Sequence, residues 1–322
     1  MALEEIKVED LNVESFISEQ VKTISDTVGD GTAVNALSGG VDSAVVTLLG
    51  HRALGDRLRT YFVDNGLMRQ DEPQFVVDTF KKLGVNVELV DARDRFFKAL
   101  KGISDPEEKR DRGITRVFYE DVFGKLVRES GAKFLLQGTI YTDIEETVAG
   151  IKRQHNVLEQ LGISTEESYG YTVLEPVIRL RKPAVRLVGK ALELPDSISE
   201  RPPFPGPALT ARIVGEATPE RVEIVRKATK IVEEELDGVD KFQCMAILHE
   251  DRVTGIRNGR REFGRQIEVR CWDSTDAVTA KPTRVSYDIL EKLAERLTAE
   301  VPGVVSVTYG IAKKPPSTME VV

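Results

Sequence analysis

The chain has 322 residues, is 41% hydrophobic and 30% charged, and carries a formal net charge of −8. This composition is typical of a globular protein of one or two domains, and the acidic balance argues against a general nucleic-acid-binding surface. We expect no membrane span, because no apolar run approaches about 18 residues, and no signal peptide at the acidic start. The two cysteines fit no metal-binding spacing or disulfide framework, so we expect a reduced, cytoplasmic protein.

Helical spacing of apolar residues predicts a first helix over residues 13–28. An apolar strand then ends in Ser38-Gly39-Gly40-Val41-Asp42-Ser43, which opens a second helix. Two adjacent glycines let the backbone approach a ligand, and the amides at the helix start, with the two serine hydroxyls, form an anion site. A carboxylate beside an anion site is explained by a divalent cation between them. The segment therefore predicts a polyphosphate bound with Mg²⁺.

The segments that follow alternate between strand and helix. Strands are predicted over residues 58–63, 85–90, 134–137 and 173–177, with helices over 73–83 and 183–194. This alternation predicts an α/β fold with a parallel sheet, whose ligand lies beyond the carboxyl ends of the strands. The turn after Val63, Asp64-Asn65-Gly66, would lie beside the glycine-rich loop and could face an adenine, although an ordinary turn explains these residues equally well. Gly138 and Asp143 follow the fourth strand, so Asp143 could share a cation with Asp42.

Two basic segments remain open to interpretation. Asp105-Pro106 is typical of a helix start, and the cluster after it forms either a solvated helix face or a clamp for a phosphate or an acidic substrate; its members are Lys109, Arg110, Arg112 and Arg116. The polar stretch 151–171 is a candidate lid, because it is long and carries Lys152 and His155. A lone histidine is equally compatible with an ordinary surface position.

Prolines and a glycine crowd residues 201–208 and exclude both a helix and a central strand. We predict a domain boundary there, with one domain over 1–200 and a second over 201–322. The second domain is predicted to be a small α+β unit with helices over 219–236 and 287–300 and strands over 244–248, 266–272 and 304–311. It ends in a cationic and then polar tail, residues 313–320.

Motifs along almost the whole chain resemble the synthetase part of GMP synthetases: ALSGGVDS, FVDNGL, DRFFKAL, DPEEKR, QGTIYTD, IKRQHNV, RPPFPGP and KPPST. The resemblance implies a PP-loop ATP pyrophosphatase domain (adenine nucleotide alpha hydrolase-like) followed by a dimerisation domain that shares in substrate binding. It also implies ATP-dependent amination of xanthosine monophosphate to GMP, through an adenylated intermediate and with release of AMP and pyrophosphate.

The resemblance carries roles onto matching residues. ATP would be bound by Ser38, Gly39, Gly40, Val41, Asp42, Ser43, Val63 and Gly138, and Mg²⁺ by Asp42 and Asp143. Asp42, Lys152 and His155 would serve catalysis, the last two as part of the lid. Xanthosine monophosphate would be bound by Arg95, Pro205, Gly206, Lys314, Thr318 and Glu320. Nothing in the sequence resembles the Cys-His-Glu set of a glutamine amidotransferase, so the resemblance implies a stand-alone, archaeal-type subunit, a homodimer that takes ammonia from a separate amidotransferase subunit.

The acceptor half departs from the family pattern more than the ATP half does. The lid has lost one histidine and its glycines, Pro183-Ala184 replaces an Asp-Glu pair, Ala208 replaces a glycine, and the chain ends in Val321-Val322. These changes leave an alternative open, a paralogue that adenylates a different oxo group for amination or thiolation. A third hypothesis is a non-catalytic nucleotide binder. The two predicted cation ligands, Asp42 and Asp143, argue against it, because a protein that only binds a nucleotide does not need both.

Overall fold

The computed structural model describes residues 3–148, 171–202, 204–275 and 278–321. The chain divides into two compact units. The first comprises Met1–Asp64, Glu72–Asp91 and Phe118–Arg201; the second comprises Asn65–Asp71, Ala92–Val117 and Pro202–Val322. Two segments that interrupt the first unit in sequence thus pack with the second, and the boundary between residues 200 and 201 stays a prediction.

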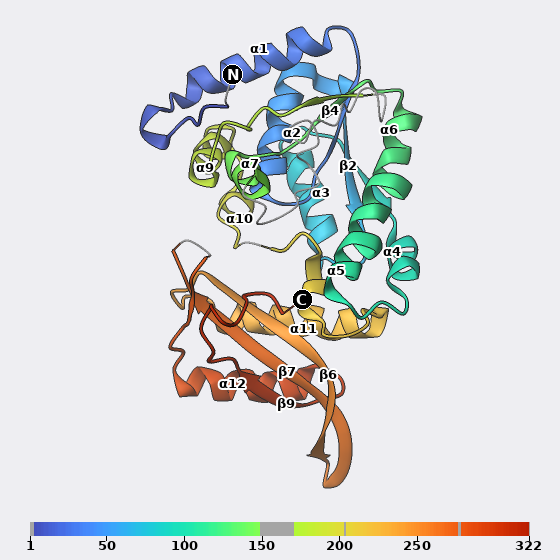
Figure 1. The fold of residues 1–322 in the computed structure, drawn as a ribbon, viewed down its shortest axis with the longest axis vertical. Helices are drawn as coiled ribbons and strands as arrows, with labels where there is room; N and C mark the ends of the chain where they lie inside the picture. The colour runs from blue at the N-terminus through green and yellow to red at the C-terminus, as the bar shows by residue number, and fades with distance from the viewer. Residues whose placement is uncertain (1–2, 149–170, 203, 276–277, 322) are drawn as a thin grey trace. The chain divides into compact units, whose positions relative to one another are not determined.

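A five-stranded, all-parallel sheet forms the centre of the first unit (Figure 1), in the order β3-β2-β1-β4-β5. The strands are β1 (Ala33–Ala36), β2 (Leu58–Asp64), β3 (Val87–Asp91), β4 (Phe134–Leu136) and β5 (Thr172–Leu174). The predicted parallel α/β sheet is confirmed. The fifth strand ends three residues earlier than predicted because Pro176 cannot donate to a strand ladder.

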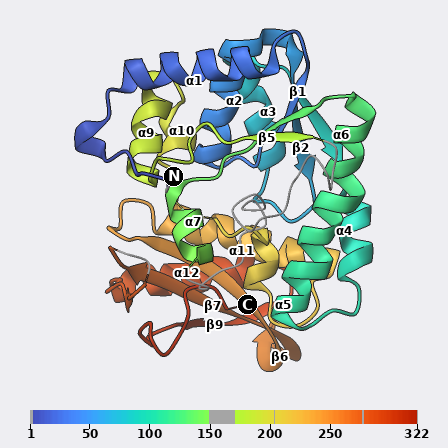
Figure 2. The same ribbon diagram turned by 45° about the horizontal axis from the view of Figure 1, so that its top comes forward.

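Helices cover both faces of this sheet, as parallel sheets require. On one face, buried Asn35 of β1 donates to Thr47 of α2 (Val41–Leu54), which packs against α1 (Val13–Val28) and α9 (Lys182–Ala191). Val34 points the opposite way, since side chains alternate along a strand, and joins a core cluster with Phe123 and Val127. Those two residues belong to η3 (Lys109–Phe123), a helix with π-type hydrogen bonding, and to α6 (Gly124–Ser130) (Figure 2). The remaining helices of this unit are η1 (Val8–Asp10), η2 (Gly55–Arg57), α3 (Glu72–Lys82), α7 (Tyr141–Val148) and α10 (Asp196–Ser199).

The second unit is built on a four-stranded sheet. It contains β6 (Gln243–Arg257), β7 (Arg260–Asp273), β8 (Lys281–Pro282) and β9 (Val304–Tyr309), and β7 pairs with the other three. Helices α11 (Pro219–Glu235) and α12 (Tyr287–Glu300) pack against β6 and β9 respectively and against each other. A second apolar cluster joins Met245, Ile247 and Trp272 to Met319 of the C-terminal tail. The shorter helices are α4 (Arg93–Leu100), α5 (Pro106–Glu108) and η5 (Ala208–Arg212).

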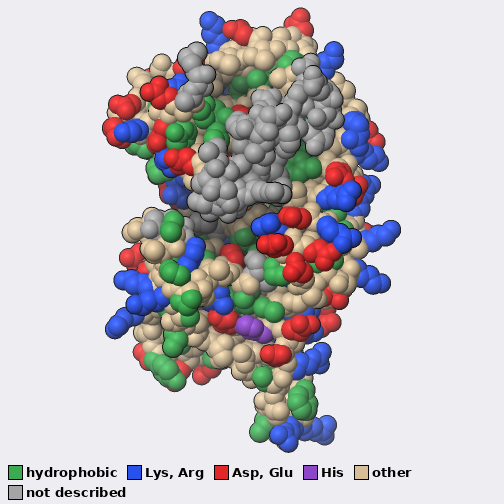
Figure 3. All heavy atoms as spheres, in the orientation of Figure 1, with side chains coloured by type: hydrophobic (Ala, Val, Ile, Leu, Met, Phe, Trp, Pro, Cys, Tyr) green, Lys and Arg blue, Asp and Glu red, His purple; other side chains and the backbone are tan. Residues whose placement is uncertain are grey.

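Strand β6 has 15 residues and β7 has 14, about three times and twice the predicted lengths, because both strands continue into a hairpin arm, residues 252–265. Its turn is Asn258-Gly259, with φ of 52° and 73°. Asn-Gly with positive φ at both residues is the sequence favoured in two-residue hairpin turns. The arm exposes Ile256 and Phe263, and arginine side chains gather at its tip (Figure 3). Within the described residues, no helix is both long and apolar enough to cross a membrane.

Candidate functional site

The predicted phosphate loop is a closed turn between β1 and α2. The Ser38 and Ser43 hydroxyl oxygens lie 2.9 Å apart, the Ser38 backbone N–H donates to Ser43 Oγ over 3.1 Å, and Ser43 Oγ donates to the Gly40 carbonyl. The first helical hydrogen bond runs from the Ala44 N–H to the Gly40 carbonyl. Gly40 has extended backbone angles and gives no side-chain cap. The first N–H groups of α2 therefore face outward without a capping side chain, which is the geometry that binds an anion.

Gly39 lies against a charged pair that sequence reasoning did not identify. Its φ is +82°, a left-handed conformation that favours glycine. A Cβ built on Gly39 would lie 3.3 Å from Glu72 Oε1 and 3.3 Å from a methyl of Val76. Glu72 is 3% exposed and accepts a 2.6 Å hydrogen bond from Arg201. Glu72 and Arg201 therefore support the loop at Gly39. In the sequence, the available signals were that Glu72 follows the DNGL turn and that Arg201 begins the proline-rich segment.

The loop lies where the strand order of the sheet reverses. From β1 the chain proceeds to β2 and β3 on one side, and β4 and β5 lie on the other. Ligands of open α/β sheets bind at such a switch point, beyond the carboxyl ends of the strands. Gly138 follows β4 here, and a Cβ on it would approach the Ser43 nitrogen to 3.1 Å and the Asp42 carbonyl carbon to 3.2 Å. The structure thus brings Gly138 into contact with the first turn of α2.

Asp42 is suited to a cation. Its Oδ1 is buried and has no hydrogen-bond partner among the described residues, while Oδ2 lies 3.2 Å from Lys182 Nζ. A buried carboxylate oxygen without a donor is unfavourable, and carboxylate oxygens are the ligands Mg²⁺ prefers. Asp143 follows β4 on α7, where its Oδ2 accepts a 3.0 Å hydrogen bond from the Ile140 N–H. No cluster of three or more His, Cys, Asp or Glu suited to a metal exists among the described residues.

Lys182 is a candidate that sequence reasoning missed. It begins α9, shortly after β5, and its ammonium pairs with Asp42. Its neighbour Arg181 donates to Glu5 and Glu145 and lies over the Tyr141 ring. A lysine at the start of a helix that follows the carboxyl end of a parallel strand was the available signal.

Other predicted ATP-site residues have simpler outcomes. Val63 is buried in β2, paired with Val90 of β3, next to the carboxyl end of its strand. Lys152 and His155, the predicted lid residues, lie outside the described residues.

Candidate acceptor residues lie in the second unit. Arg95 is on α4, and Pro205 and Gly206 precede η5. In the tail, Lys314 exchanges two backbone hydrogen bonds with Ala280, and the Thr318 hydroxyl donates to the Glu320 carbonyl.

Glu320 is held by two side chains that the motif did not include. Gln243 donates to its Oε1 over 3.1 Å, and Arg212 Nε lies 3.4 Å from its Oε2. Arg212 is fully buried, and its Nη1 has no hydrogen-bond partner among the described residues. The Arg212 and Arg69 guanidinium groups lie 4.9 Å and 4.0 Å from the centre of the Phe204 ring, within cation–π range. Arg212 at the end of η5 thus contacts both the Glu320 carboxylate and the Phe204 ring of the proline-rich segment.

Lys109, from the predicted basic cluster, is neither solvated nor available to a ligand. It is 1% exposed, and its Nζ donates to the carbonyls of Ile213 and Gly215 over 2.7 and 2.9 Å. Burial, together with the nearby Arg221 charge, lowers the pKa of Lys109 to about 8. Arg110 pairs with Asp111 of the same helix, and Arg112 pairs with Glu108 at the end of α5. In this cluster the buried member is structural and these two are surface ion pairs.

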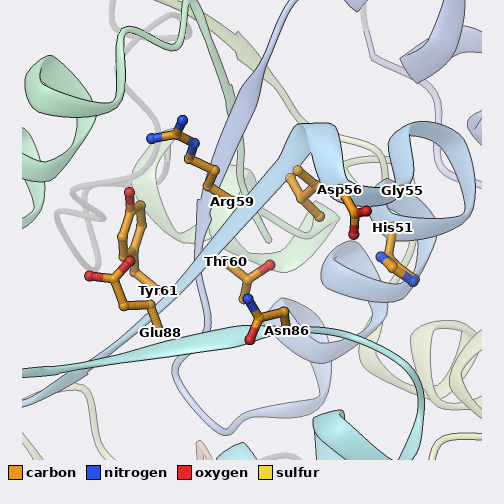
Figure 4. A pocket seen from close by; sticks show the side chains of 9 residues that line it. His51, Gly55, Asp56, Arg59, Thr60, Tyr61, Asn86 and Glu88 are labelled. Atoms are coloured by element: carbon orange, nitrogen blue, oxygen red, sulfur yellow. The ribbon is translucent and has the colours of Figure 1, made fainter.

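A polar cavity of about 500 Å³ lies at the other end of the first unit's strands. It is lined by the last turns of α2 and the first residues of β2 and β3, with His51 and Asp56 at one side and Arg59 and Glu88 at the other (Figure 4). Because it adjoins the amino ends of the strands, it is separate from the phosphate loop.

Comparisons with known proteins match both units. A family model described as NAD synthase matches residues 11–211, and one described as GMP synthase C terminal domain matches residues 230–321. A subunit of the glutamine-hydrolyzing GMP synthase of Archaeoglobus fulgidus is 50% identical over 96% of this chain and 99% of its own length. The corresponding subunit from Thermococcus kodakarensis is 46% identical over 95% and 99%, respectively. An NH3-dependent NAD synthetase from Campylobacter jejuni aligns with a TM-score of 0.46 and 13% identity, over 59% of this chain and 77% of that one.

Proposed function

The chain belongs to the family of these archaeal GMP synthase subunits, and we propose that it catalyses ATP-dependent amination of xanthosine monophosphate to GMP. The observation that carries the proposal is the phosphate loop, where a buried carboxylate oxygen of Asp42 has no hydrogen-bond partner among the described residues and lies beside an uncapped helix start. That arrangement supports binding of a nucleoside triphosphate with a cation. The tail residues Lys314, Thr318 and Glu320 support an acceptor nucleotide.

The chain's own residues would act by positioning and by stabilising charge. The outward N–H groups of α2 and the Ser38 and Ser43 hydroxyls would bind the departing pyrophosphate as the 2-oxo oxygen of the acceptor attacks the α-phosphorus. Ammonia would then displace AMP from the adenylated acceptor. This sequence needs no protein nucleophile, only reactants held in line.

Asp42 and Asp143 would hold Mg²⁺, which when bound neutralises charge on the triphosphate. Lys182 would exchange its pairing with Asp42 for a phosphate oxygen once that carboxylate binds a cation. Lys152 and His155 would close over the reactants as the lid.

The acceptor would bind through Arg95, Pro205, Gly206, Lys314, Thr318 and Glu320. Lys314 and Thr318 suit its phosphate, and the Glu320 carboxylate suits a donor on the base edge. Gln243 and Arg212 would fix that carboxylate in place.

The same family membership supports proposals about partners and location. We propose that a separate glutamine amidotransferase subunit supplies ammonia, that the second unit mediates a homodimer, and that the enzyme is cytoplasmic.

The deciding experiment measures AMP release from ATP with xanthosine monophosphate and ammonium chloride. We expect release that depends on both and yields GMP in equal amount. AMP release that ignores xanthosine monophosphate but depends on another oxo compound would transfer the assignment to a paralogue that adenylates a different acceptor.

A further inference from the structure

The C-terminal tail of the second unit is held on the sheet by an arginine that neither the motifs nor the proposed site includes. Arg270 lies on β7, and its Nη1 donates to the carbonyls of Thr318 and Met319 over 3.0 and 3.4 Å. The Met319 side chain, 9% exposed, inserts into the cluster of Met245, Ile247 and Trp272. Arg270 therefore holds the backbone of Thr318 and Met319. The side chains of Thr318 and Glu320, on either side of Met319, are the candidate acceptor ligands.

Arg270 is itself held in one orientation. Its Nε donates to Glu268 Oε1 over 2.7 Å, and both side chains are only 13% exposed. The other carboxylate oxygen of Glu268 lies 2.8 Å from His249 Nε2. Although burial alone would raise the pKa of Glu268, hydrogen bonds from Arg270 and His249 lower it. A carboxylate with partners on both oxygens fixes the planar guanidinium in the direction of the tail.

The end of β9 leaves room for this pair. Gly310 donates its N–H to the Val269 carbonyl, and a Cβ built on it would lie 2.7 Å from Glu268 Oε1 and 3.1 Å from Arg270 Cγ. Any larger residue at this position would push the Glu268 carboxylate away from the guanidinium.

We propose that Arg270 is a positioning residue for the acceptor nucleotide, acting through the Thr318 and Met319 carbonyls, with Glu268 and His249 as the residues that orient it. The inference rests on the proposed function for the identity of the nucleotide. It assigns Arg270 no contact with the reacting atoms. Its effect is on the geometry of the tail, so it concerns binding of the acceptor and leaves the ATP half of the reaction unchanged.

The main test replaces Arg270 with Gln and measures steady-state kinetics with xanthosine monophosphate, ATP and ammonium. Hydrogen bonds from a charged donor set the scale, so we expect KM for xanthosine monophosphate to rise about tenfold or more. KM for ATP should stay within about twofold, as for a substitution remote from its site. Arg270→Lys keeps the positive charge but loses the planar guanidinium with its several donors. Its KM for xanthosine monophosphate should lie between those of the parent and Arg270→Gln.

A matched control lies on the same strand. The Arg265 side chain is also 13% exposed and pairs with Glu220, but it makes no hydrogen bond or ion pair with the tail among the described residues. Arg265→Gln should leave KM for xanthosine monophosphate within about twofold of the parent value. Equal increases in KM in both variants, or an unchanged KM in Arg270→Gln, would overturn the inference.

Hydrogen–deuterium exchange separates this inference from the proposed function. In Arg270→Gln, amides of residues 317–321 should exchange faster than in the parent, while those of β6 and β7 should not change. Gly310→Ala should accelerate the same amides by displacing Glu268. If the parent enzyme fails to use xanthosine monophosphate, the proposed function fails, but tail exchange still decides the role of Arg270. Unchanged tail exchange in both variants would refute it.

Discussion

The phosphate loop of the first unit and the acceptor tail of the second hold their candidate residues in different ways. The loop is closed by contacts between residues at most five positions apart, Ser38 with Gly40 and Ser43. The tail is held by side chains 48 to 108 positions away, Arg270, Gln243 and Arg212. Hydrogen bonds between neighbouring residues thus close the anion site, with Glu72 and Gly138 packed against it, whereas the acceptor tail takes its side-chain support from distant parts of the fold. Substitutions in the loop, in the tail and in the residues that hold them distinguish these two modes of support.

The largest effect is expected where local geometry places a charge. Asp42→Ala removes the buried oxygen suited to Mg²⁺ and should reduce acceptor-dependent AMP release at least about 1,000-fold, because loss of transition-state charge stabilisation is typically of this order. The fold should persist, as judged by circular dichroism and unfolding midpoint. Asp56→Ala, an exposed aspartate just beyond the other end of α2, is the control. Near-normal AMP release in Asp42→Ala would remove the cation argument.

Lys109 is held by distant residues of the second unit, the carbonyls of Ile213 and Gly215, and its titration tests how strongly its burial affects stability. Burial and the Arg221 charge lower its pKa in the folded protein to about 8 from 10.5. Below pH 8 both states are protonated; between pH 8 and 10.5 only the unfolded state keeps the proton, so raising the pH stabilises the folded state. At about 1.36 kcal/mol per pKa unit, the gain reaches roughly 3 kcal/mol by pH 10.5.

Urea unfolding at several pH values between 7.5 and 10.5 measures this gain. Lys109→Met removes the titrating group, so the free energy of unfolding of the parent should rise relative to that of the variant across the interval. Other groups that titrate there are common to both proteins and cancel in the difference. Parallel pH curves would mean that Lys109 keeps an ordinary pKa in the folded protein.

The sequence predicts what depends on neighbours along the chain. Spacing alone predicted α1 and α12 with their observed bounds, and adjacent glycines with two serines predicted the turn that opens α2. The hairpin arm was missed although Asn258-Gly259 signalled it, because the alternating pattern beyond Leu248 is interrupted by a shift in strand register and by charged residues.

Contacts between distant residues were beyond the reach of the sequence. Lys109 reads as one of four surface cations until its carbonyl partners, more than 100 positions away, are known. Glu72 and Arg201 likewise become a pair only in the folded first unit. Side-chain type specifies which partners are chemically possible, and only topology determines which of them are near.

Gly39 probes how much the loop depends on its backbone conformation. Gly39→Ala places a Cβ at φ of +82° and 3.3 Å from Glu72 and Val76, so KM for ATP should rise about tenfold, equivalent to about 1.4 kcal/mol. Gly29→Ala is a matched control, since Gly29 also has positive φ, +55°, but has open space around its Cβ position. If both variants lose stability and neither has a higher KM for ATP, the conformation of Gly39 and its close contacts with Glu72 and Val76 do not determine ATP binding.

The smallest effect is expected at Ala208. Its backbone conformation is a local feature, but it begins the short helix η5, whose last residue, Arg212, supports the tail at Glu320. Its φ is +54°, where a Cβ costs about 1–2 kcal/mol, and glycine's greater freedom in the unfolded chain returns about 0.4–1 kcal/mol of that. Ala208→Gly should therefore raise the free energy of unfolding by about 0.5–1 kcal/mol, measured by urea titration. Ala211→Gly, in the same helix without positive φ, should lower it. KM for xanthosine monophosphate should stay unchanged in Ala208→Gly, because relieving local strain leaves the contact between Arg212 and Glu320 in place; a higher KM would mean that the strained turn itself sets the position of Arg212.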